Sequence, residues 1–279
     1  MKKIVIFGAG STGKREFNSL SSEERVIAFF DNDMDKWNTE FLGVPVYEPS
    51  KKQLFGLDFD QLVIASVQGY EEIRNYLLDC GVPNEKIRMH KRDANCFPFF
   101  LNNLKSLFVS KKIDGSIAEA GVYRGDSAAL MNEVFCEKKL YLFDTFEGFD
   151  VSDTDYEKDK QYSSAKPGQF ANTSEQIVMN KMKYPDKVII RKGYFPNSAA
   201  GISDHFCFVR LDMDLYLPTK QGLDFFHDKM VGGGVIVVHD YFGEAYPGVK
   251  DAVDEYISEK KNLSICPMGD RLSIIVVGY

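Results

Sequence analysis

Two short apolar runs that end in acidic residues most constrain what this chain can fold into. The first, at 206–216, reads FCFVRLDMDLY, and the second, at 234–241, reads GVIVVHDY. Each run has the length and the β-branched and aromatic content of a buried strand in a parallel sheet. The residues between them, 218–230, have the apolar spacing of a helix, which Thr219 is expected to cap.

A strand, a helix and a second strand form a crossover unit whose two parallel strands end at the same edge of the sheet. Open α/β sheets bind their ligands outside these carboxyl ends. We therefore expect a polar cluster there, made of Asp212, Asp214, His239 and Asp240. Asp214 has an alternative role, which is to cap the turn that follows it.

The length and charge of the chain limit the classes of function. A chain of 279 residues suits two domains, and it has no run near the roughly 20 apolar residues that span a bilayer. The net charge of −7, with dispersed Lys and Arg, argues against a nucleic-acid partner. The first apolar run, 4–7, is too short for a signal peptide. We therefore expect a cytoplasmic protein with a small-molecule substrate and no membrane partner, and the sequence leaves homo-oligomerisation open.

The five cysteines are scattered and contain no CxxC pair, which argues against a disulfide framework or a zinc site.

Residues 1–95 are predicted to form a small Rossmann-like domain. An apolar run at 3–7 leads into Gly8-Ala-Gly10-Ser-Thr-Gly13, and a helical pattern covers 14–20. A GxGxxG between a strand and a helix predicts a backbone amide cradle for a phosphate, and Asp31 follows near the place of a ribose-binding acid. The alternative is that these glycines only allow a tight crossing of strand and helix.

The α/β alternation of this first unit continues through patterns at 43–47, 61–65, 71–78 and 87–89. Phe30-Asp-Asn-Asp33 and the later Gly43-Val-Pro-Val46 resemble the small Rossmann-like domains that precede catalytic domains in sugar-nucleotide and surface-polysaccharide enzymes. The boundary to the second unit is predicted near residue 95, and the aromatic run at 96–100 is expected to pack between the units.

The second unit, 96–279, opens with a strand that ends on Glu119, a turn that contains Gly121, and a helix from Ser127. The next strand ends on Asp144, which is suited to hydrogen-bond a ribose diol. Because the turn has one glycine before Tyr123, it matches a pyrophosphate cradle poorly. A nucleoside without phosphates fits better, and S-adenosylmethionine is such a ligand.

Several blocks of this unit, in order, resemble the macrocin O-methyltransferase (TylF/MycF-type) family of class I methyltransferases. The blocks are Glu119-Ala-Gly-Val-Tyr-Arg-Gly125, Phe143-Asp-Thr-Phe-Glu-Gly148, Lys192-Gly-Tyr-Phe-Pro196, Val209-Arg-Leu-Asp-Met-Asp-Leu-Tyr216, His239-Asp-Tyr241 and 247–256. The resemblance implies a second Rossmann-like, doubly wound parallel sheet that ends in an antiparallel hairpin, for which 263–266 and 272–277 have strand patterns.

The same resemblance implies roles for individual residues. Cofactor contacts would come from Glu119, Gly121, Tyr123, Asp144, Thr145, Phe146, Gly193 and Tyr194. Asp212, His239 and Asp240 would be the metal-binding and catalytic residues. The family uses S-adenosylmethionine and a divalent metal, usually Mg²⁺, to methylate a hydroxyl group on a sugar.

His239 departs from the family, which has an acid at this position. The imidazole has three alternative roles: a ligand that prefers softer metals than Mg²⁺, a general base, or a hydrogen-bonding group without chemistry. A dication that binds two vicinal oxygens would lower the pKa of a sugar hydroxyl and fix the line of attack.

Residues 147–175 lack periodicity and are predicted to form a long irregular lid over the site, in which Tyr156, Tyr162 and Phe170 stack on the sugar or the cofactor.

The sequence thus predicts a metal-assisted, S-adenosylmethionine-dependent O-methyltransferase for a nucleotide-linked, surface-glycan or natural-product sugar. One alternative is an NAD(P)-dependent sugar-nucleotide oxidoreductase that uses the first unit, although Tyr70 is followed by Arg74 where a Tyr-x-x-x-Lys pair would be needed. Another is a non-catalytic S-adenosylmethionine-binding scaffold.

Overall fold

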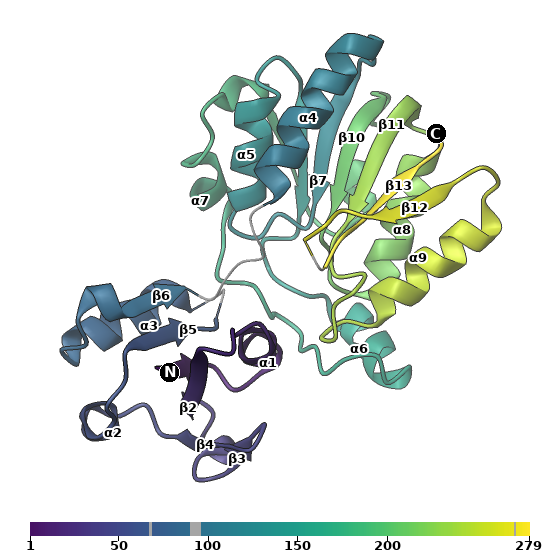
Figure 1. The fold of residues 1–279 in the computed structure, drawn as a ribbon. Coiled ribbons are helices and arrows are strands. Elements are labelled where there is room, and N and C mark those ends of the chain that lie inside the picture. The colour runs from purple at the N-terminus through teal and green to yellow at the C-terminus, as the bar shows by residue number, and fades with distance from the viewer. Residues whose placement is uncertain (67–68, 90–95, 271) are drawn as a thin grey trace. The chain divides into compact units, whose positions relative to one another are not determined.

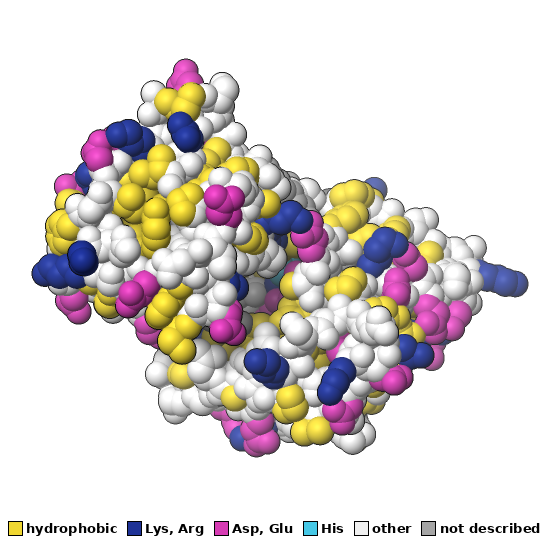
Figure 2. All heavy atoms as spheres, turned by 90° about the horizontal axis from the view of Figure 1, so that it is seen from below, with side chains coloured by type: hydrophobic (Ala, Val, Ile, Leu, Met, Phe, Trp, Pro, Cys, Tyr) yellow, Lys and Arg dark blue, Asp and Glu magenta, His cyan; other side chains and the backbone are white. Residues whose placement is uncertain are grey.

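The computed structural model describes residues 1–66, 69–89, 96–270 and 272–279, and the chain divides into two compact units, Met1–Ala94 and Asn95–Tyr279 (Figure 1). On the face that Figure 2 presents, acidic and basic side chains are interspersed. None of the helices in the described residues combines the length and the apolar character that crossing a bilayer requires.

The first unit is an α/β sandwich around one sheet of order β3-β4-β2-β1-β5-β6, parallel except for the antiparallel pair β3–β4. Its strands are β1 (Lys2–Phe7), β2 (Glu24–Phe30), β3 (Glu40–Phe41), β4 (Val44–Tyr47), β5 (Gln61–Ile64) and β6 (Ile87–Met89). Its helices are α1 (Ser11–Asn18), α2 (Lys51–Gly56) and α3 (Tyr70–Asp79). The parallel α/β prediction for this unit is confirmed.

The glycine-rich turn after β1 is shaped by backbone packing. A Cβ atom at Gly13 would lie 1.9 Å from the Gly8 carbonyl oxygen, so glycine is required for the crossing of α1 over β1. The helix begins at Ser11, three residues before the predicted start, because the Lys14 amide already donates to the Gly10 carbonyl at 2.9 Å.

Asp31, the expected ribose-binding acid, makes hydrogen bonds and an ion pair within the first unit. Its Oδ2 accepts from the Ala9 amide at 2.7 Å and lies 3.2 Å from Lys36 Nζ. The Trp37 indole N–H donates to the Asp31 carbonyl at 2.7 Å. These contacts fit the alternative in which the GxGxxG sequence serves the crossing of strand and helix.

The second unit is built on a sheet of order β12-β13-β11-β10-β7-β8-β9, in which β13 alone runs antiparallel to its two neighbours, β11 and β12. Its strands are β7 (Ser116–Ala120), β8 (Leu140–Asp144), β9 (Val188–Lys192), β10 (Phe206–Leu211), β11 (Met230–Val238), β12 (Ser264–Pro267) and β13 (Ile274–Val277). The predicted doubly wound sheet with a closing antiparallel hairpin is confirmed.

Helices cover both faces of this sheet, and each face has its own core. The helices are α4 (Cys96–Lys111), α5 (Asp126–Val134), α6 (Val151–Asp159), α7 (Glu175–Met179), α8 (Tyr216–His227) and α9 (Gly248–Glu259). The core under α4, α5 and α7 contains Leu104, Met131 and Val178, and the core under α8 and α9 contains Phe226 and Tyr256. Figure 1 shows α4 and α5 on the opposite side of the sheet from α8 and α9.

The aromatic run at the start of α4 makes contacts within the second unit, and its packing between the units stays a prediction. Phe97 and Phe100 stack on each other and pack against the core of the second unit, where Phe100 contacts Phe208 at a ring distance of 6.0 Å. Phe99 is 74% exposed.

The helix between β10 and β11, α8, starts and ends earlier than the predicted range of 218–230. It begins at Tyr216, and Thr219 is buried in its first turns and does not cap it. The cap comes from far away in the sequence, because Glu157 Oε1 accepts from the Tyr216 amide at 2.9 Å. The helix ends at His227 because Met230 already starts β11.

The prediction that 147–175 is irregular is wrong for 151–159, which form α6, whereas 160–174 contain no helix or strand. Asp150 caps α6 through the Ser152 amide, and the helix runs for nine residues. Tyr156 and Tyr162 both stack on Tyr216, at ring distances of 5.4 and 5.6 Å.

Candidate active site

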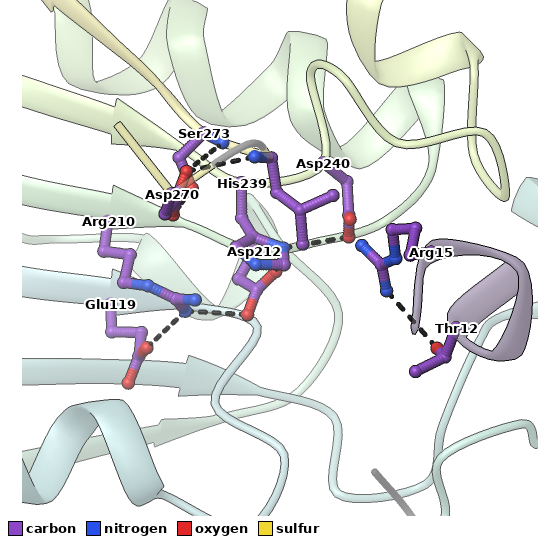
Figure 3. A network of polar contacts seen from close by, with 10 residues as sticks. Thr12, Arg15, Glu119, Arg210, Asp212, His239, Asp240, Asp270 and Ser273 are labelled. Carbon is purple, nitrogen blue, oxygen red and sulfur yellow. Dashed lines mark hydrogen bonds and ion pairs between the residues drawn. The ribbon is translucent and has the colours of Figure 1, made fainter. Parts of the chain in front are cut away.

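The acids at the carboxyl ends of β10 and β11 lie together. These strands are parallel neighbours with Leu211 opposite Val238, so Asp212 and His239 follow at the same edge of the sheet. His239 Nδ1 lies 2.9 Å from Asp212 Oδ1 and 3.0 Å from Asp240 Oδ2 (Figure 3). Strand register alone therefore assembles the three residues.

Two acids of this edge have strained backbone conformations. Asp214 has a φ of 62° and Asp240 a φ of 60°, in the left-handed region that non-glycine residues rarely adopt. Burial, together with the charges of Asp240 and Asp212, raises the pKa of Asp214 well above its ordinary value. Strained residues that persist in a fold are typical of functional sites.

Opposite charges fix the ionisation of the cluster. Burial opposes ionisation of Asp212, but Arg210 and His239 outweigh it and hold the pKa of Asp212 well below its ordinary value. Burial also disfavours the charged form of His239, but Asp212 and Asp240 raise its pKa well above the ordinary value. Without a bound cation, these acids favour the protonated form of the ring.

The donor set fits a divalent cation. Asp212, His239 and Asp240 each offer one ligand atom, and these atoms lie within 4.8 Å of one another. His239 Nδ1 is buried at ion-pair distance from two oxygens, yet neither oxygen meets it in hydrogen-bond geometry. Two carboxylates with one imidazole suit Mn²⁺, Fe²⁺ or Zn²⁺, and the carboxylates also suit Mg²⁺ with water.

The expected cofactor residues lie on the neighbouring strands β7 and β8. Asp144 Oδ2 accepts from the amides of Val122 and Tyr123, both at 2.8 Å, and its Oδ1 accepts from the Phe146 amide at 2.7 Å. Asp144 thus shapes the two turns that begin where β7 and β8 end. A carboxylate has about four acceptor positions, so one remains for a ligand.

The structure gives Gly121, Thr145 and Phe146 packing and turn roles. A Cβ atom at Gly121 would lie 1.9 Å from the Asp212 carbonyl oxygen, so the glycine allows the turn to touch the end of β10. Thr145 Oγ1 donates to the Gly148 carbonyl at 2.9 Å. The Phe146 ring is buried in the core under α4 and α5.

Gly193 and Tyr194 follow β9 at the same edge. Gly193 has a φ of 127°, a conformation that favours glycine. The Tyr194 hydroxyl donates to Asp153 Oδ1 at 2.7 Å, and burial followed by this bond raises the pKa of Tyr194. The end of β9 is thereby tied to α6.

The site has two halves: the turns after β7 and β8, where the cofactor is expected, and the acids after β10 and β11. The segment after α6 contacts both. Gln169 Nε2 donates to the Tyr246 hydroxyl at 2.8 Å, and the Tyr123 hydroxyl donates to Asn172 Oδ1 at 2.9 Å. Phe170 meets the Tyr123 ring edge-on at 5.4 Å. Asp214 and Asp240 contribute to the raised pKa of Tyr246, for which burial is the largest cause, so this tyrosine lies near the acids.

Sequence reasoning missed Arg210 and Tyr246. Arg210 Nη1 donates to Glu119 Oε1 and to Asp212 Oδ2, both at 2.7 Å (Figure 3). Arg210 lies inside an apolar strand, two residues before Asp212. Charged residues are rarely buried without a partner, so an arginine in this run could have indicated an ion pair.

Comparison with known proteins gives two family matches. The sequence model of the family described as macrocin O-methyltransferase (TylF) matches residues 100–268, which is more than half of the chain. A second model, described as C2185-like, N-terminal, matches residues 1–88.

Two curated relatives are similar in sequence. The chain is 28% identical over 159 residues to demethyldecarbamoylnovobiocin O-methyltransferase of Streptomyces niveus, which is 53% of this chain and 60% of that protein. It is 28% identical over 204 residues to 8-demethyl-8-(2,3-dimethoxy-alpha-L-rhamnosyl)-tetracenomycin-C 4'-O-methyltransferase of Streptomyces olivaceus, which is 66% of this chain and 77% of that protein.

The solved structure of the O-methyltransferase NovP superposes with a TM-score of 0.52 at 20% identity, over 64% of this chain and 77% of that chain, and shows the shared fold. With the match over residues 100–268, the chain belongs to the macrocin O-methyltransferase (TylF) family.

Proposed function

We propose that this protein transfers the methyl group of S-adenosylmethionine to a hydroxyl group of a sugar-containing small molecule, with the help of a divalent cation. The observation that carries the proposal is the cluster of Asp212, His239 and Asp240. It lies at the sheet edge where β7 and β8 carry the turns shaped by Asp144. Membership in an O-methyltransferase family supports the reaction type.

The acceptor class is supported by the relatives. One of them is named for a rhamnosyl group and the other for a novobiocin precursor. The first unit resembles domains found in sugar-nucleotide and surface-polysaccharide enzymes. We therefore propose a nucleotide-linked, glycan or natural-product sugar as the acceptor, Mg²⁺ as the ion and the cytoplasm as the location.

In the proposed mechanism, Asp212 and Asp240 hold the cation, which when bound lowers the pKa of the acceptor hydroxyl. Asp144 and the turn after Glu119 would position the cofactor. Because the methyl donor is a sulfonium cation, attack by an alkoxide neutralises charge, and the main task of the protein is alignment. A metal ligand and a general base both require the neutral imidazole, so the raised pKa of His239 favours neither of these two roles over the other.

A binding titration tests the cofactor assignment. S-adenosylhomocysteine, the demethylated product, should bind in isothermal calorimetry. Absence of binding at millimolar concentrations would refute the proposed function.

Two substitutions test the acid cluster. Asp212→Asn and Asp240→Asn should lower methyl transfer to a panel of sugar nucleotides by at least about a hundredfold, because each removes a charged group that would hold the cation. The affinity for S-adenosylhomocysteine, measured without added cation, should stay within about threefold. Asp186→Asn, at a carboxylate with a 72% exposed side chain, is the matched control and should retain activity. Loss of cofactor affinity in Asp240→Asn would show that its role is assigned wrongly.

A third substitution separates the roles of His239. His239→Asp restores the acid that the family resemblance implies at this position. Activity with Mg²⁺ should persist if His239 is a ligand, because a carboxylate can take the ligand position of the imidazole. An inactive, folded variant that still binds the cofactor would favour the general-base role.

A further inference from the structure

Arg210 connects the two halves of the site through one nitrogen atom. Arg210 and Glu119 are partners in the register of β10 and β7, so their side chains leave the same face of the sheet. Asp212 follows two residues later and shares that face. Arg210 Nη1 bonds to both carboxylates, at 2.7 Å each (Figure 3).

Arg210 thus forms a bridge between Glu119 and Asp212. It contacts one oxygen of each carboxylate and does not contact the other. Glu119 Oε2 is buried and has no hydrogen-bond partner. Asp212 Oδ1 faces His239 Nδ1 at 2.9 Å. The oxygen that Arg210 does not contact therefore lies in the cofactor half of the site for Glu119 and beside His239, in the metal half, for Asp212.

The surroundings hold this bridge rigidly. The Glu119 side chain is fully buried and that of Arg210 is 9% exposed. The Phe97 ring lies 5.5 Å from the guanidinium carbon and covers the guanidinium. Since these groups have little room to move, a shift of one carboxylate is transmitted to the other.

The backbone couples the same two segments directly. The Asp212 amide donates to the Ala120 carbonyl at 2.8 Å. Gly121 approaches the Asp212 carbonyl so closely that no side chain fits between them. The turn that would bind the cofactor therefore cannot move without moving the start of the acid cluster.

We propose that Arg210 is a positioning residue that couples cofactor binding to metal binding by holding Glu119 and Asp212 in one rigid unit. This inference rests on the proposed function, because it requires that both ligands bind. Each ligand should then raise the affinity for the other by the same factor, which linkage between two sites demands.

The test is a titration with Mn²⁺, followed by calorimetry and by water-proton relaxation, with and without saturating S-adenosylhomocysteine. In the unmodified protein, S-adenosylhomocysteine should strengthen Mn²⁺ binding by at least about fivefold. Arg210→Gln should weaken Mn²⁺ binding by roughly 10–100-fold, as loss of a residue that orients a metal ligand does, and should abolish the coupling.

Arg210→Lys keeps the charge and guards against a variant that does not fold. A lysine ammonium is a flexible point charge, so the coupling factor should fall to below about twofold even though the fold is retained. Arg191→Lys is the matched control, since the Arg191 guanidinium donates to the Ser198 and Ala200 carbonyls and contacts neither carboxylate of the Arg210 bridge among the described residues. It should leave both affinities and their coupling unchanged.

The outcomes separate the inference from the proposed function. If the unmodified protein binds S-adenosylhomocysteine and Mn²⁺ without coupling, or if folded Arg210→Lys retains full coupling, the inference is wrong and the proposed function stands. If S-adenosylhomocysteine does not bind at all, the proposed function itself fails.

Discussion

Glu119 is an expected cofactor contact whose pKa is strongly altered by its surroundings. Burial raises its pKa to about 7, against an ordinary value of 4.5, although the charge of Arg210 opposes the shift. The folded state therefore binds the proton more tightly than the unfolded state, and the free energy of unfolding should fall as the pH rises from about 4.5 to about 7.

The variant Glu119→Gln should flatten this part of the pH profile of stability. At roughly 1.4 kcal/mol per pKa unit, the unmodified protein should lose about 3 kcal/mol more of its free energy of unfolding than the variant between about pH 4.5 and about pH 7. Urea denaturation of both proteins at a series of pH values measures it. Parallel profiles for the two proteins would show that Glu119 does not titrate in this range.

Gly121 is the residue whose replacement should be most costly to the backbone of the site. Its φ is 82°, and a Cβ atom would overlap the Asp212 carbonyl oxygen. Gly121→Ala should lower the free energy of unfolding by at least about 3 kcal/mol, because steric overlap adds to backbone strain.

Gly201→Ala is the control for Gly121→Ala. Gly201 has a similar φ of 77°, and nothing lies within 4 Å of the Cβ position. Its cost should be about 1–2 kcal/mol, from the strain alone. Equal losses in the two variants, measured by urea denaturation, would contradict the overlap argument.

At the residue scale, the sequence predicted the acids better than their partners. Asp212 and His239 were predictable because each directly ends an apolar strand, and strand ends of a parallel sheet meet. Arg210 was missed because the pairing depends on the register between β10 and β7, which are far apart in the sequence. The packing roles of Gly121 and Phe146 also depend on tertiary contacts that a motif does not reveal.

At the element scale, α6 and α8 stabilise each other. Glu157 is buried, accepts from the Tyr216 amide at the start of α8, and accepts from Ser163 Oγ at 2.7 Å. Tyr216 in turn stacks between Tyr156 and Tyr162. One carboxylate thus caps a helix that comes much later in the chain.

The substitution Glu157→Ala should destabilise this pair of helices by about 1–3 kcal/mol, because it leaves the Tyr216 amide without an acceptor. Hydrogen exchange should accelerate at 151–163 and in the first turn of α8. Asp155→Ala, at an exposed position of the same helix, should leave these rates unchanged. Unchanged exchange in Glu157→Ala would mean that Tyr216 finds another acceptor.

The errors at the element scale have local causes. The sequence of α6, rich in Asp, has almost no amphipathic pattern, so periodicity did not reveal it. Thr219 was expected to cap a helix over 218–230, whereas the helix already starts at Tyr216 and the distant Glu157 caps it there. The strands were predicted more closely because each apolar run is short and bounded by acids or glycines.

At the scale of the whole molecule, composition and motif order indicated two α/β units, and the compact units meet between Ala94 and Asn95. The role of the first unit was harder to predict, because the same glycine pattern serves a phosphate cradle or a tight crossing. The close approach of Gly13 to Gly8 and the internal contacts of Asp31 fit the crossing. They weaken the oxidoreductase alternative.

Trp37 is the single tryptophan of the chain, and its indole is anchored to the Asp31 carbonyl in the first unit. Fluorescence excited at wavelengths that tyrosine does not absorb therefore reports on the first unit alone. Near-ultraviolet dichroism sums the aromatic residues of both units and includes the stacked rings of Tyr156, Tyr162 and Tyr216, so a dichroism transition that Trp37 fluorescence does not share belongs to the second unit. The protein thus carries a native optical probe in each unit, and the order in which the units melt can be read without any label.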